Sequence, residues 1–275
     1  METVKRFNFT IGWREIGILF AGYFLAQVVI GIIGAFMMFV LKEDYATSSG
    51  FLLIAYLLSL GLPILFFDLF VTRPKGNKLN FNFSSKPLLT YVLIFPMMFG
   101  MMLISEYLTN LIPTTGPLFG WLYKSFLEQM NSISVDHAAM VIMVAIFAPL
   151  LEEILFRGII LKAMLNKGIK PKKAILFSAL IFGAIHGYPW QFLGAFLLGL
   201  VLGLVYWKTK SLLMSILLHS FNNFIAAMLI IFTKDESFKT IINLPEIYLL
   251  IAGLVLFGIS YYFFMHRNKI IYQES

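Results

Sequence analysis

Long apolar runs separated by short polar loops follow one another along most of this chain. A helix needs roughly 20 predominantly apolar residues to cross the hydrocarbon core of a bilayer. Runs of this kind predict transmembrane helices near residues 16–41, 51–72, 88–112, 138–161, 174–187, 191–207, 211–232 and 247–265. The fifth run is shorter than the others. The pattern therefore predicts an all-α, polytopic membrane protein with about eight transmembrane helices.

The composition supports a membrane protein independently of any single run. Of the 275 residues, 60% are hydrophobic and only 13% are charged, whereas a soluble domain carries about 25% charged residues. The chain has no cysteine, which excludes disulfides, thiol nucleophiles and cysteine-ligated metals. No low-complexity linker and no clear internal repeat interrupts the pattern. We therefore expect residues 1–275 to form a single membrane domain, an integral protein of a membrane.

Basic residues concentrate in alternate loops, and this asymmetry predicts the orientation. Most of them lie in segments 1–15, 73–87, 162–173, 208–210 and 267–269. The positive-inside rule places these segments, and with them both termini, in the cytoplasm. The net charge of +7 is then mainly loop charge that faces the anionic leaflet of the lipid bilayer. Because the charges are dispersed over short loops, nucleic acid is not an expected partner.

Three ionisable residues lie inside the fourth apolar run: Glu152, Glu153 and Arg157. An ionisable side chain near the middle of a membrane helix costs about 2.5–3.5 kcal/mol on insertion scales and marks a candidate functional site. The four-residue spacing predicts an ion pair between Glu153 and Arg157. Glu152 is turned about 100° away and is free to act as a general base in the bundle. The structural alternative is a buried charge lock between helices.

Further polar groups lie in later apolar runs. His186 is near the end of the fifth run, while His219 and Asn223 share one face of the seventh. Counted from the ends of their helices, Glu152, His186 and His219 fall at similar depths. Taken alone, His186 is typical of a structural or interfacial histidine. The His219–Asn223 pair alone would equally suit an interhelical hydrogen bond.

Together, these groups suffice for hydrolysis of an amide. Glu152 and His186 could activate a water molecule, and His219 and Asn223 could donate hydrogen bonds to the oxyanion. Alternatively, Glu152, His186 and His219 could bind Zn²⁺ and leave one position open for water. The residues leave a metal-independent mechanism equally open. No HExxH zinc helix, GxSxG serine elbow or phosphate-binding loop occurs in the chain.

Three motifs carry a resemblance to a known family: EEILFRG, FGAIH and HSFNN, in this order. They resemble EExxxR, FxxxH and HxxxN of the CPBP intramembrane proteases, which include type II CAAX prenyl endopeptidases and bacterial Abi proteins linked to bacteriocin self-immunity. The resemblance covers about 138–232, the expected catalytic core. It implies that Glu152 and His186 activate water, that His219 and Asn223 form the oxyanion site, and that Glu153 and Arg157 support them. The compact chain, without targeting extensions, looks like a bacterial member, which would place it in the bacterial cell membrane.

We therefore expect an intramembrane endopeptidase whose substrate is a membrane-embedded or membrane-associated peptide or protein. Two other functions fit parts of the pattern. The first is a non-proteolytic membrane scaffold or bacteriocin immunity factor that acts by binding a partner. The second is a proton-coupled transporter that uses the carboxylates as a proton relay, for which broken helices or inverted repeats would be the signature.

Overall fold

The computed structural model describes residues 9–42, 48–134, 136–233, 237–242 and 244–267. Within these ranges every regular element is helical. Seven helical stretches of the described chain are long and apolar enough to cross a membrane: Trp13–Leu41, Ser49–Lys75, Leu88–Asn110, His137–Asn166, Pro189–Thr209, Leu212–Thr233 and Glu246–His266. The prediction of an all-α, polytopic membrane protein is confirmed.

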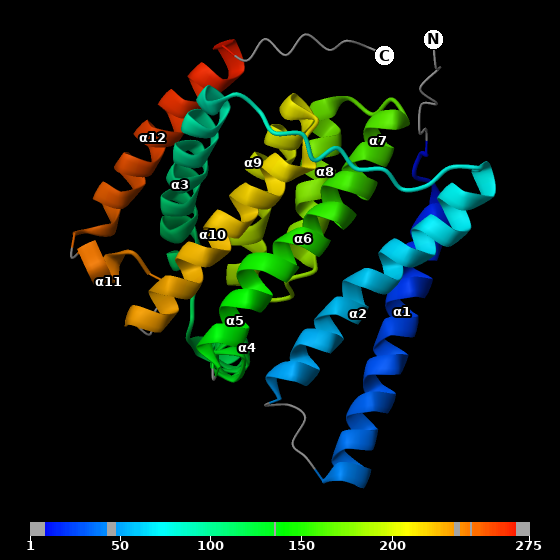
Figure 1. Ribbon diagram of the computed structural model, residues 1–275. Coiled ribbons are helices and arrows are strands. Elements are labelled where there is room, and N and C mark those ends of the chain that lie inside the picture. Colours follow the sequence, from blue (N-terminus) through cyan, green and yellow to red (C-terminus); the bar gives the residue numbers. More distant parts are fainter. Residues whose placement is uncertain (1–8, 43–47, 135, 234–236, 243, 268–275) are drawn as a thin grey trace, which may run out of the picture.

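The predicted fifth span is a helix, but a short one. It forms α8 (Pro171–Ala184), whose 14 residues extend over about 21 Å at 1.5 Å per residue. This length is less than the roughly 30 Å of the hydrocarbon core. The chain leaves α8 through Gly187, whose φ of +78° suits glycine after a helix end. The short helix nevertheless returns the chain between the two ends of the bundle (Figure 1).

The first two long stretches form a hairpin at one side of the molecule (Figure 1). It consists of α1 (Trp13–Phe36) with η1 (Met37–Leu41), and of α2 (Ser49–Phe67) with η3 (Asp68–Thr72) and η4 (Arg73–Lys75). The two helices approach closely, because a Cβ added at Gly22 would lie 2.8 Å from the Cα of Pro63. Gln27 also donates a hydrogen bond of 3.1 Å to the Ser59 hydroxyl.

The other helices form the main bundle. One continuous stretch contains the predicted glutamates and is wound alternately as α- and π-helix. Its parts are α5 (His137–Ile142), η5 (Met143–Phe147), α6 (Ala148–Glu153), η6 (Ile154–Leu161) and α7 (Lys162–Asn166). Beside it lie α8, α9 (Pro189–Thr209) and α10 (Leu212–Thr233), and outside them α3 (Leu88–Asn110), α4 (Gly116–Ile133), α11 (Lys239–Ile242) and α12 (Glu246–Arg267).

Hydrogen bonds show which loops share an end of the bundle. Lys162 donates to the Asn80 carbonyl at 3.2 Å, Asn82 to the Lys210 carbonyl at 2.9 Å, and Asn166 to the Phe9 carbonyl at 3.0 Å. The described parts of the basic loops therefore gather at one end, as the alternation of basic loops requires. That this end faces the cytoplasm stays a prediction.

At the opposite end, the amphipathic helix α4 packs on the loop between α8 and α9. The ring of Tyr123 lies 5.0 Å from the ring of Trp190 between centroids. The hydroxyls of Ser125 and Tyr188 are hydrogen-bonded at 3.1 Å. In Figure 1, α4 is seen nearly end-on and lies across the direction of the long helices.

Two glycines bring the backbones of α3 and α12 together. A Cβ at Gly100 would lie 2.7 Å from the Phe257 nitrogen and 2.8 Å from the Gly253 oxygen. These are backbone atoms, so relief of the clash would require the two helices to separate. The α3–α12 interface therefore depends on the missing side chain at Gly100.

We expect Gly100→Ala to lower the melting temperature of the purified protein, because overpacking of a close contact costs about 1–3 kcal/mol. The matched control is Gly258→Ala on α12, where an added methyl group meets nothing within 4 Å. That change should preserve or slightly raise the melting temperature, since alanine favours the helix. Equal melting temperatures for the two variants would contradict the close approach.

Candidate active site

Glu152 and Glu153 end α6, between the π-helical segments η5 and η6. π-turns are rare and occur often at functional sites. Pro149 has no N–H, so the carbonyl of Val144, five residues earlier, has no π-type donor within the helix. Asn223 of α10 supplies a donor, because its Nδ2 lies 2.7 Å from that carbonyl oxygen. The π-wound segment is thus held to α10 through a side chain.

The predicted ion pair is present. Arg157 Nη1 lies 2.8 Å from Glu153 Oε1, and both side chains are completely buried. Arg157 also donates from Nη2 to the Gly199 carbonyl of α9 at 3.1 Å. Its guanidinium lies 4.5 Å from the centroid of the Phe182 ring, a distance that favours a cation–π interaction.

Glu153 has a second partner that the sequence analysis missed. His219 Nδ1 lies 2.9 Å from the same Glu153 Oε1 that accepts from Arg157. Glu153 therefore fixes the orientation of the His219 ring as well as the Arg157 side chain. Because the two residues are 66 positions apart and on different helices, no spacing rule could indicate this contact.

The other nitrogen of His219 faces Glu152. His219 Nε2 lies 3.7 Å from Glu152 Oε2, which is too long for a hydrogen bond. Glu152 is only 7% exposed, and its Oε2 has no hydrogen-bond partner within the described residues. A buried, unpaired carboxylate oxygen is unusual, since such groups are normally satisfied. The two side chains are therefore close to each other without being bonded.

The second oxygen of Glu152 is engaged by a residue that the motifs do not contain. The Tyr56 hydroxyl of α2 donates a hydrogen bond to Glu152 Oε1. Tyr56 lies 96 residues before Glu152, in an apolar run with no other sign of chemistry. Only the packing of the hairpin on the bundle reveals this contact.

His186 lies near the end of α8 and is half-buried. Its Nδ1 donates to the Phe182 carbonyl at 2.7 Å, because a carbonyl oxygen can only accept. In the neutral ring, Nε2 is then left as the acceptor nitrogen. The Phe182 ring contacts both histidines, with centroid distances of 5.0 Å to His186 and 5.6 Å to His219. Phe182 thus brings the two histidines to the same region, although within the described residues no hydrogen bond or ion pair joins His186 to Glu152.

Asn223 lies one turn beyond His219 on α10, as its spacing predicted. In this structure one of its amide hydrogens goes to the Val144 carbonyl, and its Oδ1 accepts from Asn222 Nδ2 at 2.9 Å. An amide nitrogen has two hydrogens, so Asn223 keeps one further donor. Asn223 therefore has a structural contact in addition to the role that the motif implies.

The described side chains do not form a ready metal site. Within the described ranges, no group of three or more His, Cys, Asp or Glu residues is arranged to hold a metal ion. A catalytic zinc site needs three protein ligands about 2.0–2.2 Å from the metal. Glu152 Oε1 is already bound by Tyr56, and His219 Nδ1 faces Glu153. Glu152 Oε2, His186 Nε2 and His219 Nε2 are left as the atoms that would bind Zn²⁺, and among the described residues they are not arranged as a metal site.

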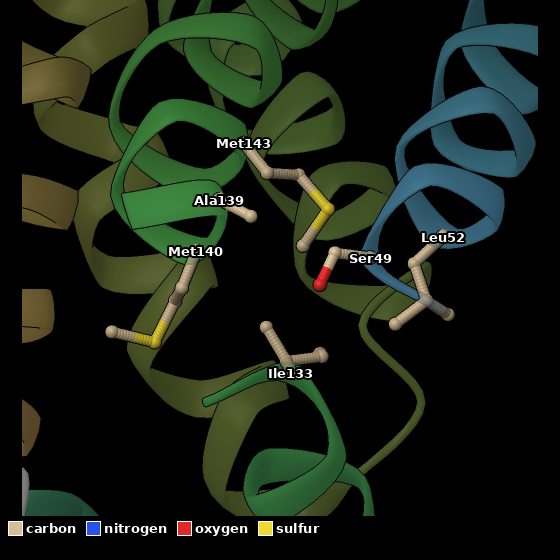
Figure 2. A pocket seen from close by; sticks show the side chains of 6 residues that line it. All are labelled: Ser49, Leu52, Ile133, Ala139, Met140 and Met143. Atoms are coloured by element: carbon tan, nitrogen blue, oxygen red, sulfur yellow. The ribbon is translucent and has the colours of Figure 1, made fainter. Parts of the chain in front are cut away.

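A hollow lies between α2 and the helical stretch that carries Glu152, at the α4 end of that interface. Figure 2 shows its lining: Ser49 and Leu52 of α2, Ile133 of α4, Ala139 and Met140 of α5, and Met143 of η5. None of the predicted site residues lines it. Leu52 precedes Tyr56 by one turn of α2, so the hollow and the Tyr56–Glu152 contact lie along the same helix.

Comparison with known proteins supports the resemblance carried by the motifs. Residues 134–225 match the family described as type II CAAX prenyl endopeptidase Rce1-like. No curated protein and no solved structure matches the chain. The matched segment contains all six predicted site residues and begins after α1–α4, so Tyr56 lies outside it. Residues 134–225 are therefore similar to the domain of the type II CAAX prenyl endopeptidases.

Proposed function

We propose that this protein hydrolyses a peptide bond of a membrane-embedded or membrane-associated peptide or protein, with Glu152 as the general base. The observation that supports this proposal is the buried, unpaired Oε2 of Glu152, 3.7 Å from His219 Nε2. A general base needs a free lone pair within reach of the proton that it takes. Glu153 Oε2 is also unpaired, but Glu153 is completely buried and ion-paired with Arg157, so it suits the proposed base less well than Glu152, which is 7% exposed.

In the proposed reaction, Glu152 Oε2 takes a proton from a water molecule that His186 Nε2 helps to hold. The water oxygen adds to the peptide carbonyl carbon and gives a tetrahedral intermediate. The intermediate collapses as the C–N bond breaks, and Glu152 returns the proton to the leaving nitrogen. The products are a carboxylic acid and an amine, and Glu152 is again a carboxylate.

His219 is the proposed donor to the oxyanion. Glu153 accepts from Nδ1, so a doubly protonated ring has its Nε2–H free for the oxyanion. The positive charges of Arg157 and of this imidazolium would balance the two carboxylates. The second amide hydrogen of Asn223 provides a further donor. Loss of one such donor typically costs about 10²–10³ in kcat.

Zinc bound by Glu152, His186 and His219 is the other route to an activated water molecule. It would require these three side chains to converge from the positions described above. The metal content of active, purified protein distinguishes the two routes.

We expect His219→Ala and His186→Ala each to lower kcat by about 100-fold or more, since each removes a group proposed to act on the water or the oxyanion. The assay uses proteoliposomes with a library of membrane-anchored peptides, and mass spectrometry identifies the new termini. His137→Ala is the matched control, because His137 is exposed at the start of α5. Wild-type cleavage by both active-site variants, with unchanged melting temperatures, would refute the proposed mechanism.

A further inference from the structure

Tyr56 belongs to the N-terminal hairpin, outside the Rce1-like segment, yet it contacts the proposed general base. Its hydroxyl donates to Glu152 Oε1, while Glu152 Oε2 has no hydrogen-bond partner in the described chain. The two oxygens of one carboxylate thus have different surroundings. One is bonded to α2, and the other faces His219 of α10.

Packing fixes where the Tyr56 hydroxyl lies. The Tyr56 ring packs against an apolar cluster that joins α2 to the glutamate-bearing stretch. Leu60 and Phe67 of α2 share this cluster with Leu155 and Phe156 of η6. Because these residues are buried on both sides of the interface, α2 holds the tyrosine beside Glu152.

We propose that Tyr56 is a positioning residue for Glu152, an inference that rests on the proposed function. A carboxylate is planar, so a hydrogen bond that holds Oε1 also fixes the direction of Oε2. In this arrangement Oε2 points to the region between Glu152 and His219, where the water and the peptide carbonyl react. The donated hydrogen bond also stabilises the ionised carboxylate, which is the form that takes the proton.

The closest other role for Tyr56 is that of a cap. A hydroxyl that covered Glu152 and had to leave before water could bind would inhibit the enzyme, and its removal would raise the rate. The free Oε2 favours positioning, because the atom proposed to take the proton is not the one that Tyr56 occupies. The two roles predict rate changes of opposite sign.

The test is Tyr56→Phe in the full-length protein, which removes the hydroxyl and keeps the ring. We expect kcat to fall by about 10- to 100-fold, a loss typical of a misplaced catalytic group, with KM unchanged. A fall in kcat at constant KM is expected of a misplaced catalytic group, whereas a weakened binding site would raise KM. The titratable and charged groups that surround Glu152 are Tyr56 itself, His219 of α10, and Glu153 and Arg157 of the same helical stretch. Only the hydroxyl is changed.

Tyr91→Phe is the matched control, because the Tyr91 hydroxyl is also hydrogen-bonded, to Ser85 at 2.8 Å, but away from Glu152. It should leave kcat and KM unchanged. Because partial unfolding of Tyr56→Phe would also lower the measured rate, kcat is calculated per folded molecule, with the folded fraction taken from the melting curve.

Three results would overturn the inference. An unchanged kcat in Tyr56→Phe would reduce Tyr56 to a packing role, and a higher kcat would make it a cap. Both leave the proposed function standing, provided that Glu152→Gln is inactive. Cleavage by Glu152→Gln would remove the general base, and with it any positioning role for Tyr56.

Discussion

We expect Glu152→Gln to lower the rate of peptide cleavage strongly and to leave the protein folded. Glutamine has nearly the same shape as glutamate, and its Oε1 can still accept from Tyr56, but its amide cannot take a proton from water. General base catalysis contributes about 10²–10⁴ to a rate, so we expect kcat to fall by about that factor. The measurement is the initial rate of cleavage in proteoliposomes, together with the melting temperature of each protein.

A second glutamate provides the control for this change. Glu128 of α4 is exposed, and it forms an ion pair of 4.0 Å with Lys124 one turn earlier. Glu128→Gln removes one carboxylate from the same protein and should keep the wild-type rate. If Glu152→Gln cleaved within about twofold of the wild-type rate, general base catalysis by Glu152 would be excluded, because the effect expected of a base is far larger.

Arg157→Met destabilises the protein strongly. The change would leave Glu153 completely buried without its cationic partner, and breaking a buried ion pair from one side costs about 3–5 kcal/mol. The same change removes the hydrogen bond to the Gly199 carbonyl. We expect a large fall in the melting temperature in detergent, and a loss of cleavage that follows the loss of folded protein.

Two further variants test whether the buried charge of Glu153 causes the loss of stability in Arg157→Met. Removing both charges in Glu153→Met/Arg157→Met should restore part of the stability, because replacing a buried pair by apolar residues is often neutral or stabilising. Arg73→Met breaks the pair with Asp68, in which Arg73 is 55% exposed, and exposed pairs contribute about 1 kcal/mol or less. Equal losses in Arg157→Met and Arg73→Met would contradict a buried ion pair.

The sequence predicted those parts of the fold that follow from local rules. A bilayer demands apolar runs of a certain length, so seven of the predicted spans correspond to helices long enough to cross it. The i, i+4 rule likewise predicted the Glu153–Arg157 ion pair and the placement of His219 and Asn223 on one helix. The fifth run was predicted to be short, and α8 is short, but it lies three residues earlier than the predicted 174–187, because it begins at Pro171 and ends at Ala184.

These local rules could not predict contacts between helices. The bond from Tyr56 to Glu152 spans 96 residues, and the bond from His219 to Glu153 spans 66. Both depend on how far each helix is rotated and displaced against its neighbour, and hydropathy carries no such information. Asn223 shows the same limit, since its bond to Val144 depends on the local π winding before Pro149.

The π-wound segment η5 has a consequence for the direction in which the glutamates point. Each residue of an α-helix advances the side-chain direction by about 100°, and a π-turn accommodates an extra residue in the same rise. If α-helical pitch were imposed on η5 (Met143–Phe147) with all its residues kept, every side chain beyond it would turn by about 100° relative to the start of α5. Glu152 would then no longer face both Tyr56 and His219. The direction in which the carboxylates point thus depends on the winding of the helix before them, as well as on their place in the sequence.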